Sequence, residues 1–289
     1  MARNSGEGNS MNVRKFRLIN NNGEEYNLTT KSAFLHTPSG LGYRKDTTYQ
    51  RLGNLHVVLN DAFEQGQIQA EIFFPEPNSY EKYFDFIRFC QNEPLYLKYK
   101  PAQKEYTRQI RIGEVDKTEI GPGGLNITII FDCLTLFYES HQIYGDASDA
   151  EGGKIYTYRY PYRYATSASN TLEIVSDSYA DSPCTIYIHG NCVNPVWRHY
   201  VNNILEATGA VYTTIPEGEK LAIDTTKTPY SLHRVDFANR LVADVYAASD
   251  FNTERFIMLK HGTNRITVSH DNANILTMAL EAQIIYASV

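Results

Sequence analysis

The sequence predicts a mainly β protein with one helix, in which two β-sandwich domains follow one another. Three observations support this prediction. Short apolar runs bounded by Gly, Pro, Asn or Asp recur along the chain, one segment has clear helical spacing, and a Gly/Asp/Ser-rich stretch divides the chain near its middle. Because 289 residues exceed one typical domain, we expect two domains.

The first half is expected to open with a β-hairpin. Val13–Leu28 holds two short runs around the turn Asn20–Gly23, and an Asn-Gly pair is typical of tight hairpin turns. Further apolar runs of strand length predict a sandwich, and they lie at Leu55–Asn60, Ile68–Phe74, Leu95–Tyr99, Arg108–Val115 and Leu125–Leu134.

Asn78–Asn92 predicts the helix of the first domain. Its apolar residues recur at helical rather than alternating spacing, at Tyr80, Tyr83, Phe84, Ile87 and Cys90. Asn78 with Glu81 three residues later approximates a capping box, and Pro94 prevents the helix from continuing. We interpret the stripe as a face that packs on a sheet rather than as a cofactor site.

Composition sets the expected domain boundaries. Residues 1–11 are predicted to be a flexible N-terminal extension outside the fold, and residues 12–138 form the first domain. Ser, Gly, Asp and Ala dominate residues 139–154, which indicates a linker. Residues 155–289 then form the second domain.

The second half also predicts strands, and their number suggests a jelly-roll-like sandwich. Val196–Ala207 fits either a helix or a hairpin, but Asn202-Asn203 would suit a turn and the preceding Asn194-Pro195 favours the hairpin. The other expected strands are Leu172–Val175, Cys184–His189, Lys220–Asp224, Tyr230–Asp236, Phe256–Leu259, Arg265–Ser269 and Met278–Tyr286.

An aromatic strand is expected to open the second domain. Tyrosines occupy every second position, so they would share one face of a strand, at Tyr156, Tyr158, Tyr160, Tyr162 and Tyr164. Two interpretations stay open, since such a face either packs under another sheet or forms a partner or sugar surface. Residues named for that surface are Tyr158, Tyr160, Tyr162 and the lone Trp197.

Charge and patterning exclude several function classes. The net charge of −6 and the absence of a run of five basic residues give no footprint for nucleic acid. The N-terminus resembles no signal peptide, and no apolar run reaches a membrane span, so we expect a soluble chain. Widely spaced cysteines in apolar surroundings indicate reduced, buried thiols.

No catalytic, metal or cofactor site is predicted. The common motifs GxSxG, GxxxxGK[ST], HExxH and GxGxxG do not occur, and no CxxC pair or metal-type His spacing is present. Gly121–Gly124 is interpreted as a hairpin turn rather than a phosphate loop. The paired histidines His189/His199 and His261/His270 are expected to be solvated or hydrogen-bonded.

The order of motifs resembles the distal tail protein family of long, non-contractile-tailed phages, the siphophages. In the first half, the similar segments are Pro38–Tyr43, Tyr80–Ile87, Leu95–Tyr99, and Gly124-Leu125 leading into Ile127–Phe137. In the second half they are Tyr158–Tyr162, Ile186–Gly190 with Asn194-Pro195, Gly218–Thr225, and Phe256–Leu259 ahead of Gly262–Ile266. The resemblance covers nearly the full chain.

The resemblance implies a fold and an assembly. It implies an N-terminal β-sandwich with a helix and an extended hairpin arm, and a C-terminal galectin-like or jelly-roll sandwich. Six first domains would close a ring, alone or in two stacked rings, at the baseplate hub. Six chains of −6 give the ring a formal charge of −36, which suits a lumen that passes DNA if the acidic residues face inward.

The implied partners follow from this position. The ring would bind the major tail tube protein on one side, the tail-tip or tail-associated lysin protein on the other, and a receptor-binding protein. The expected location is the distal end of the tail in the virion, after assembly in the host cytoplasm. No sequence-specific nucleic acid and no membrane insertion are expected.

The arm is expected in Leu35–Gly53, where turn residues mix with side chains common at interfaces. The predicted oligomer-interface residues are Tyr43, Arg44, Tyr49 and Arg51. Some relatives carry a carbohydrate-binding module within the second domain, but the second half of this chain has the length of one sandwich. We therefore expect a scaffold; the alternative is a lectin-like adhesion module that recognises host cell-wall polysaccharide.

Overall fold

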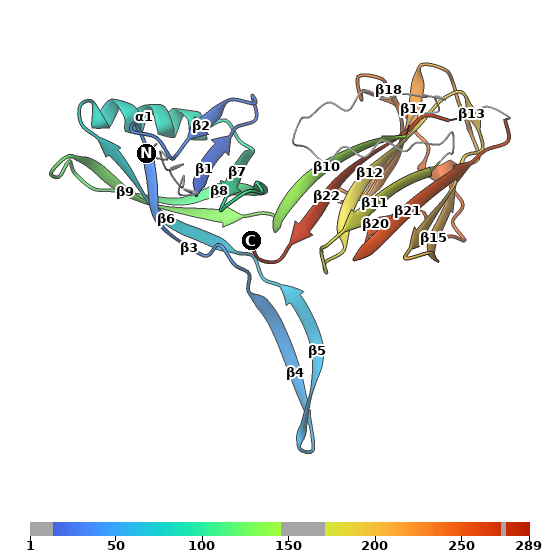
Figure 1. Cartoon of the computed structure of the whole chain (residues 1–289), viewed down its shortest axis with the longest axis horizontal. Helices are drawn as coiled ribbons and strands as arrows, with labels where there is room; N and C mark the ends of the chain where they lie inside the picture. The colour runs from blue at the N-terminus through green and yellow to red at the C-terminus, as the bar shows by residue number, and fades with distance from the viewer. Residues whose placement is uncertain (1–13, 146–170, 273–275) are drawn as a thin grey trace, which may run out of the picture. The chain divides into compact units, whose positions relative to one another are not determined.

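The computed structural model describes residues 14–145, 171–272 and 276–289 (Figure 1). It divides the chain into two compact units, Met1–Tyr138 with Ala287–Val289, and Glu139–Tyr286. Antiparallel strands dominate both units, and the described residues contain one α-helix, so the predicted fold class is confirmed. Residues 287–289 were assigned to the second domain, but Val289 packs against the core of unit 1.

Unit 1 forms one antiparallel sheet and a separate two-stranded hairpin. Its strands are β1 (Lys15–Ile19), β2 (Glu25–Asn27), β3 (Phe34–Ser39), β4 (Lys45–Leu52), β5 (Leu55–Phe63), β6 (Gln67–Pro75), β7 (Leu95–Lys100), β8 (Tyr106–Lys117) and β9 (Gly124–Cys133). Neighbours pair in the order β2-β1-β7-β8-β9-β6-β3, while β4 and β5 pair with each other. The opening hairpin, β1 with β2, is confirmed.

Alternation of side chains explains how this sheet builds its core. Along β6 the buried residues are Ile68, Ala70, Ile72 and Phe74, and the residues between them are exposed or half-buried. The same period of two along β9 buries Ile127, Ile129 and Phe131. Because alternate residues of a strand point to one face, each strand contributes one apolar row to the core.

Helix α1 (Ser79–Cys90) lies across unit 1, as Figure 1 shows, and packs on β6 and β9. Phe86 anchors it and is fully buried. Its ring centroid lies 5.3 Å from that of Tyr26 and 5.7 Å from that of Phe74. The predicted helix is therefore confirmed, and its inner face is aromatic.

Two details of the helix prediction are wrong. Asn78 adopts a left-handed backbone conformation with φ 67° and its side chain makes no capping hydrogen bond, so there is no capping box. Asparagine tolerates this conformation better than most residues. The apolar stripe also splits, because Cys90 is buried while Tyr80 and Phe84 are exposed.

Strand β10 (Phe137–Gly145) occupies the first residues of the predicted linker. Phe137 belongs to the core of unit 1, and Ile143 belongs to the core of unit 2. Residues 139–145 are therefore strand, with intervening polar residues that hid the alternation. The remainder of the predicted linker and the N-terminal extension 1–11 lie outside the described residues.

Unit 2 contains two main antiparallel sheets and a short two-stranded one, β13 with β16. Its elements are β11 (Thr171–Ser176), β12 (Ser182–His189), β13 (Cys192–Val193), β14 (Val196–Val201), β15 (Ile204–Ala210), β16 (Thr214–Ile215), β17 (Glu219–Asp224), β18 (Ser231–Asp236), β19 (Leu241–Asp244), the 3₁₀ helix η1 (Tyr246–Ala248), β20 (Met258–Leu259), β21 (Gly262–Ser269) and β22 (Met278–Tyr286). One sheet runs β19-β18-β17-β12-β22, and the other runs β11-β21-β14-β15.

A single apolar core joins the two sheets of unit 2. Ile186, Leu221 and Leu280 come from the first sheet, and Leu172 and Ile266 from the second, all of them fully buried. Inner faces that share one core define a β-sandwich. Strands occur at each position predicted from Leu172 onward, although β20 covers only Met258–Leu259 of the predicted Phe256–Leu259. The aromatic strand predicted at Tyr156–Tyr164 lies outside the described residues.

The predicted hairpin at Val196–Ala207 is also confirmed. Strands β14 and β15 pair directly, and Val201 lies opposite Ile204 across the turn. Asn202 and Asn203 both have positive φ values, 50° and 68°. This is the backbone that a two-residue hairpin turn needs, and asparagine adopts it more readily than most residues.

His199 and Asn264 form a buried polar pair in unit 2. His199 Nε2 lies 3.0 Å from Asn264 Oδ1, and both side chains are buried. Asn264 Nδ2 donates to the carbonyl oxygens of Lys260 and Gly262, which fixes the turn ahead of β21. Burial lowers the pKa of His199, so the neutral imidazole is the form that fits.

Arg255 holds the loop after η1 by cation–π contacts. Its guanidinium carbon lies 4.8 Å from the ring centroid of Tyr246, 4.6 Å from that of Phe251 and 5.7 Å from that of Phe256. Its Nη2 also donates to the Tyr246 hydroxyl at 2.7 Å. The guanidinium lies within cation–π distance of all three rings, which ties them into one cluster.

The four cysteines are free and buried, at Cys90, Cys133, Cys184 and Cys192. Burial raises the pKa of the Cys90 and Cys184 thiols to about 12. Thiols of this kind behave as small apolar side chains rather than nucleophiles.

Candidate oligomer interface

Strands β4 and β5 form an arm, defined here as residues 45–63, that leads away from the sheet of unit 1 (Figure 1). The strands pair from Lys45 with Phe63 to Leu52 with Leu55. Gly53, with φ +63°, occupies the left-handed region at the turn. Every described residue of the two strands is exposed except Thr47, which is half-buried.

The arm exposes many large apolar side chains for a surface hairpin. Their exposed fractions run from 41% at Phe63 to 71% at Leu55. The set comprises Tyr49, Leu52, Leu55, Val57, Val58, Leu59 and Phe63. An isolated two-stranded hairpin is marginally stable in water, and an exposed apolar patch of this kind marks an interaction site.

Strand register divides these side chains between the two faces of the arm. Tyr49 lies opposite Val58 and Arg51 opposite His56, and alternation places both pairs on one face. The opposite face carries Leu52 and the residues paired around it. A bulge between Thr48 and Tyr49 adds Leu59 as an extra residue on β5. Neither face of the arm is purely polar.

Polar contacts fix the base of the arm. Lys45 Nζ lies 2.5 Å from an oxygen of Asp61, and the Thr47 hydroxyl donates to the same carboxylate at 3.2 Å. The hydrogen bond from Lys45 lowers the pKa of Asp61. Arg44 Nε pairs with Glu64 at 2.7 Å. These pairs order the strands where they leave the sheet, so the arm starts from a defined direction.

The four residues predicted for the interface all lie on the arm or beside its base. Tyr43 and Tyr49 are 51% and 60% exposed. Arg44 pairs with Glu64, and Arg51 Nε donates to the Gly53 carbonyl at 2.9 Å. Their role in an oligomer therefore stays a prediction, but the structure brings them to one exposed element.

The predicted span of the arm is corrected by the structure. Leu35 belongs to β3, which pairs with β6 in the sheet and buries that side chain. The second strand of the arm, β5, was interpreted as a sandwich strand at Leu55–Asn60. Its apolar run does not reveal whether it meets a core within the same chain or another chain. Gly53-Asn54 between two runs was the available signal of a hairpin.

Trp197 is not a surface residue, so its prediction as part of a partner or sugar surface is wrong. It is fully buried, and its indole Nε1 donates to the Arg255 carbonyl at 2.9 Å. Gly209 lies against the ring, where a Cβ atom would come within 2.4 Å. Tryptophan buries a large apolar area and satisfies its single donor, which explains this core position. Tyr158, Tyr160 and Tyr162 lie outside the described residues.

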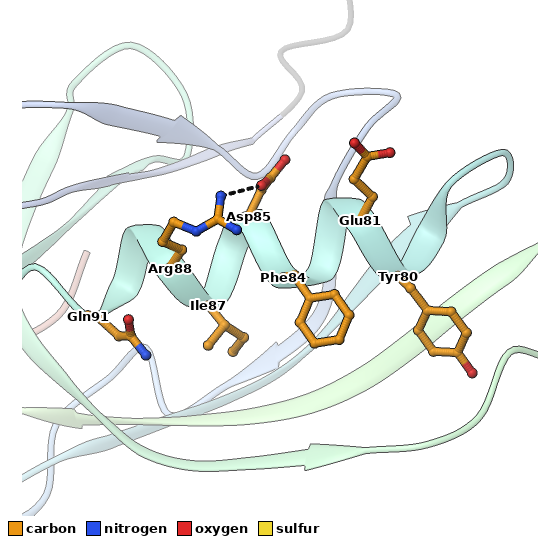
Figure 2. A pocket seen from close by; sticks show the side chains of 7 residues that line it. All are labelled: Tyr80, Glu81, Phe84, Asp85, Ile87, Arg88 and Gln91. Carbon is orange, nitrogen blue, oxygen red and sulfur yellow. Dashed lines mark hydrogen bonds and ion pairs between the residues drawn. The ribbon is translucent and has the colours of Figure 1, made fainter.

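The outward face of α1 is a second exposed apolar surface in unit 1. Figure 2 shows Tyr80, Phe84, Ile87 and Gln91 pointing to the same side of the helix. They line a shallow depression of about 630 Å³ together with Glu81, Asp85 and Arg88. Its lining residues come from α1 and from the C-cap residue Gln91, and Phe84 is 56% exposed.

Among residues 14–145, 171–272 and 276–289, no group of three or more His, Cys, Asp or Glu side chains could hold a metal ion. The turn at Gly121–Gly124 joins β8 to β9, as predicted, with a bridge between the two end glycines.

In the same described ranges, no helix is both long enough and apolar enough to cross a membrane.

Comparison with protein families identifies the first unit. Residues 15–134 match the distal tail protein, N-terminal domain. These residues contain the sheet, the helix and the arm of unit 1. Over these residues the chain is therefore similar to that domain, as its motifs suggested.

Solved structures share the fold along almost the whole chain. A chain of the phage P2 baseplate in its activated conformation with Ca is similar with a TM-score of 0.64 at 14% identity, covering 96% of this chain and 100% of that one. The corresponding baseplate with Sr gives 0.62 at 16%, with the same coverage. The phage SPP1 Dit protein, described as a hub of the adsorption apparatus, gives 0.60 at 10%, covering 92% and 98%. The comparison with curated proteins gave no match.

Proposed function

We propose that copies of this chain form the hub ring at the distal end of a phage tail. Six copies close a ring through their first domains, alone or as two stacked rings, and the second domains lie outside it. The ring connects the tail tube to the tail-tip and host-adhesion proteins. Support comes from the family match over residues 15–134 and from the full-length similarity in fold to the P2 baseplate chains and SPP1 Dit.

The exposed arm is the observation that carries this proposal. It presents apolar side chains on both faces, and its strands pair only with each other among the described residues. Covering such a surface removes apolar area from water, at roughly 25 cal/mol per Å². In a closed ring of six, a neighbouring copy covers each arm, so the arm suits a ring better than a monomer. Tyr43, Arg44, Tyr49 and Arg51 contribute to this interface.

The partners in the proposal are proteins of the tail. The major tail tube protein binds one side of the ring, the tail-tip or tail-associated lysin protein binds the other, and a receptor-binding protein attaches to the periphery. The protein assembles in the host cytoplasm and ends at the tail tip of the virion. Its role is structural rather than enzymatic.

Unit 2 is proposed to be a galectin-like sandwich that serves protein attachment. Trp197, one of the residues predicted for a sugar surface, is buried and cannot contact a sugar. The Arg255 guanidinium already contacts the Tyr246 and Phe251 rings.

Solution mass tests the proposal. Full-length protein is measured by light scattering at several concentrations, alone and with purified tail tube protein, and the same samples are imaged by negative stain. We expect rings of six or twelve chains, at least in the mixture. Single copies at every concentration, with and without the tube protein, would contradict the ring.

A further inference from the structure

We propose that the arm of one copy docks along the outward face of α1 of the next copy. This inference rests on the proposed ring and names the surface that receives the arm. The arm segment is Tyr49–Val58, and the receiving stripe is Tyr80, Phe84, Ile87 and Gln91.

The receiving surface is apolar and held in place: Tyr80 and Phe84 are exposed, and Ile87 is half-buried against the core of unit 1. Tyr80, Phe84 and Ile87 follow one another at helical spacing along one side of α1 (Figure 2). No other element lines the depression beside them. Lys117 Nζ lies 4.9 Å from the Tyr80 ring centroid, and the Tyr80 hydroxyl donates to Glu119, so the stripe starts from an ordered side chain.

The arm offers a matching face. Tyr49 and Val58 form an exposed apolar pair, 60% and 51% exposed, and Arg51 with His56 forms the next pair on that same face. An aromatic ring beside an arginine is the composition most enriched at the centre of protein interfaces. We expect Phe84 to contact this apolar pair, because it is the most exposed hydrocarbon side chain of the helix stripe.

The two elements also match in length. A helix of 12 residues is about 18 Å long at 1.5 Å per residue. The distal arm strand from Tyr49 to Leu52 with its turn spans about 14 Å at roughly 3.4 Å per residue. The helix can therefore cover the tip half of the arm along one face.

Charge favours a particular alignment. Asp85 is paired with Arg88 at 3.0 Å, whereas among the described residues Glu81 has no ion pair and lies beside the apolar stripe. Arg51, at the end of the arm, has a hydrogen bond to the Gly53 carbonyl but no ion pair in the same part of the chain. Placing Arg51 against Glu81 pairs both charges at the rim of the contact.

The occupant is a second copy. In the structure the arm leads away from the sheet on which α1 lies (Figure 1), and its extended contacts are between its own strands. A copy of this chain offers both halves of the contact, so arm to helix repeats head to tail and closes a ring.

Charge reversal tests the alignment in the full-length protein, by light scattering with tail tube protein present. Arg51→Glu and Glu81→Arg should each raise the concentration needed for rings about tenfold or more, because like charges then face each other. The double variant should restore ring formation. Phe84→Ala should also weaken rings, while its thermal unfolding stays near wild type because the side chain is exposed.

Matched controls lie in unit 2. Lys227→Glu and Glu217→Arg reverse exposed charges in turns and should leave rings unchanged. If Arg51→Glu, Glu81→Arg and Phe84→Ala form rings like wild type, or the double variant is no better than the single ones, docking on α1 is overturned and the ring proposal stands. If wild-type protein forms no rings with the tube protein, the proposed function itself is wrong.

Discussion

Leu52 and Leu55 lie directly opposite each other at the tip of the arm, 55% and 71% exposed, with only Gly53 and Asn54 between them. A leucine pair at a solvent-exposed hairpin tip has no packing role in the monomer. Burying it against another chain is favourable, because each side chain then leaves water. The pair is thus the clearest mark in unit 1 of a surface made for another protein.

Replacing this pair should separate assembly from folding. Leu52→Asp and Leu55→Asp should change the free energy of unfolding by less than about 0.5 kcal/mol, since both side chains are exposed. Each should weaken rings at concentrations where wild type forms them, because the proposed ring covers both faces of the arm and would bury the new carboxylate. Urea unfolding and light scattering on the same samples give the two readouts.

A buried leucine of unit 1 provides the control for these variants. Leu97, 1% exposed, should give a grossly destabilised protein when replaced by Asp. Rings that form normally with an aspartate at the arm tip would show that the arm is not an assembly element.

Gly209 beneath Trp197 should be intolerant of a side chain. A Cβ atom there would lie 2.4 Å from the indole ring, so Gly209→Ala should cost about 1–3 kcal/mol of unfolding free energy. Adding Trp197→Phe should recover part of that loss, which a double-mutant cycle by urea unfolding measures. Gly121→Ala, at a glycine with open space around it, is the control and should stay within about 0.5 kcal/mol of wild type. Additive effects of the two substitutions would argue against the close contact.

Stability should fall in mild acid through His199. Burial lowers its pKa in the folded protein, while the bond to Asn264 and the charge of Glu206 oppose the shift and Lys260 adds to it. Because the folded pKa lies below the unfolded value of about 6.5, the neutral form stabilises the fold above that pH, and the contribution is lost as the pH falls. The free energy of unfolding should therefore decrease from about pH 7 to about pH 5.

The variant His199→Gln identifies the group responsible for that slope. It should be less stable than wild type at neutral pH but should lose less stability on acidification, measured by urea unfolding across the pH series. Burial also lowers the pKa of His189, which leaves a remaining slope of the same sign. His56→Gln, on the exposed arm, should keep the wild-type slope. An unchanged slope in His199→Gln would rule out the assignment.

Arg255 should stabilise the loop of residues 246–256 through its planar guanidinium. Arg255→Met should cost about 0.5–2 kcal/mol and speed proteolytic cleavage in that loop, because three ring contacts and the bond to Tyr246 are lost. Arg255→Lys should rescue little, since an ammonium cannot stack on the rings. Arg240→Met, which removes an exposed pair with Asp236, serves as the comparison and should cost at most about 1 kcal/mol. Equal losses of unfolding free energy in Arg255→Met and Arg240→Met would show that the ring contacts of Arg255 add no stability beyond that of an exposed ion pair.

Local patterns predicted the elements of this fold well where periodicity and turn chemistry agreed. The helix Asn78–Asn92, the Asn-Gly hairpin at the start and the Asn202-Asn203 hairpin all combine a period with a turn or stop signal. Strand β10 was missed because its outward positions hold Ser140 and Gln142 in a stretch that begins to read as a linker. Its inward positions alternate as a strand requires.

Only part of the candidate interface could be predicted from the sequence. Tyr43, Arg44, Tyr49 and Arg51 were identified by composition, and they do lie on or beside the arm. Strand β5 looks like a sandwich strand because the same β-branched and aliphatic residues suit a core and an interface. Trp197 misled for the converse reason, since a lone tryptophan suits a binding surface and a core equally, and only its burial decides.

The number of chains in the assembled particle tests the central claim most directly. Native mass spectrometry of the full-length protein mixed with tail tube protein counts the copies without assuming a shape. The account predicts particles that hold six copies of this chain or a multiple of six, and predicts that Leu55→Asp weakens them. Particles with one or two copies under every condition would contradict it.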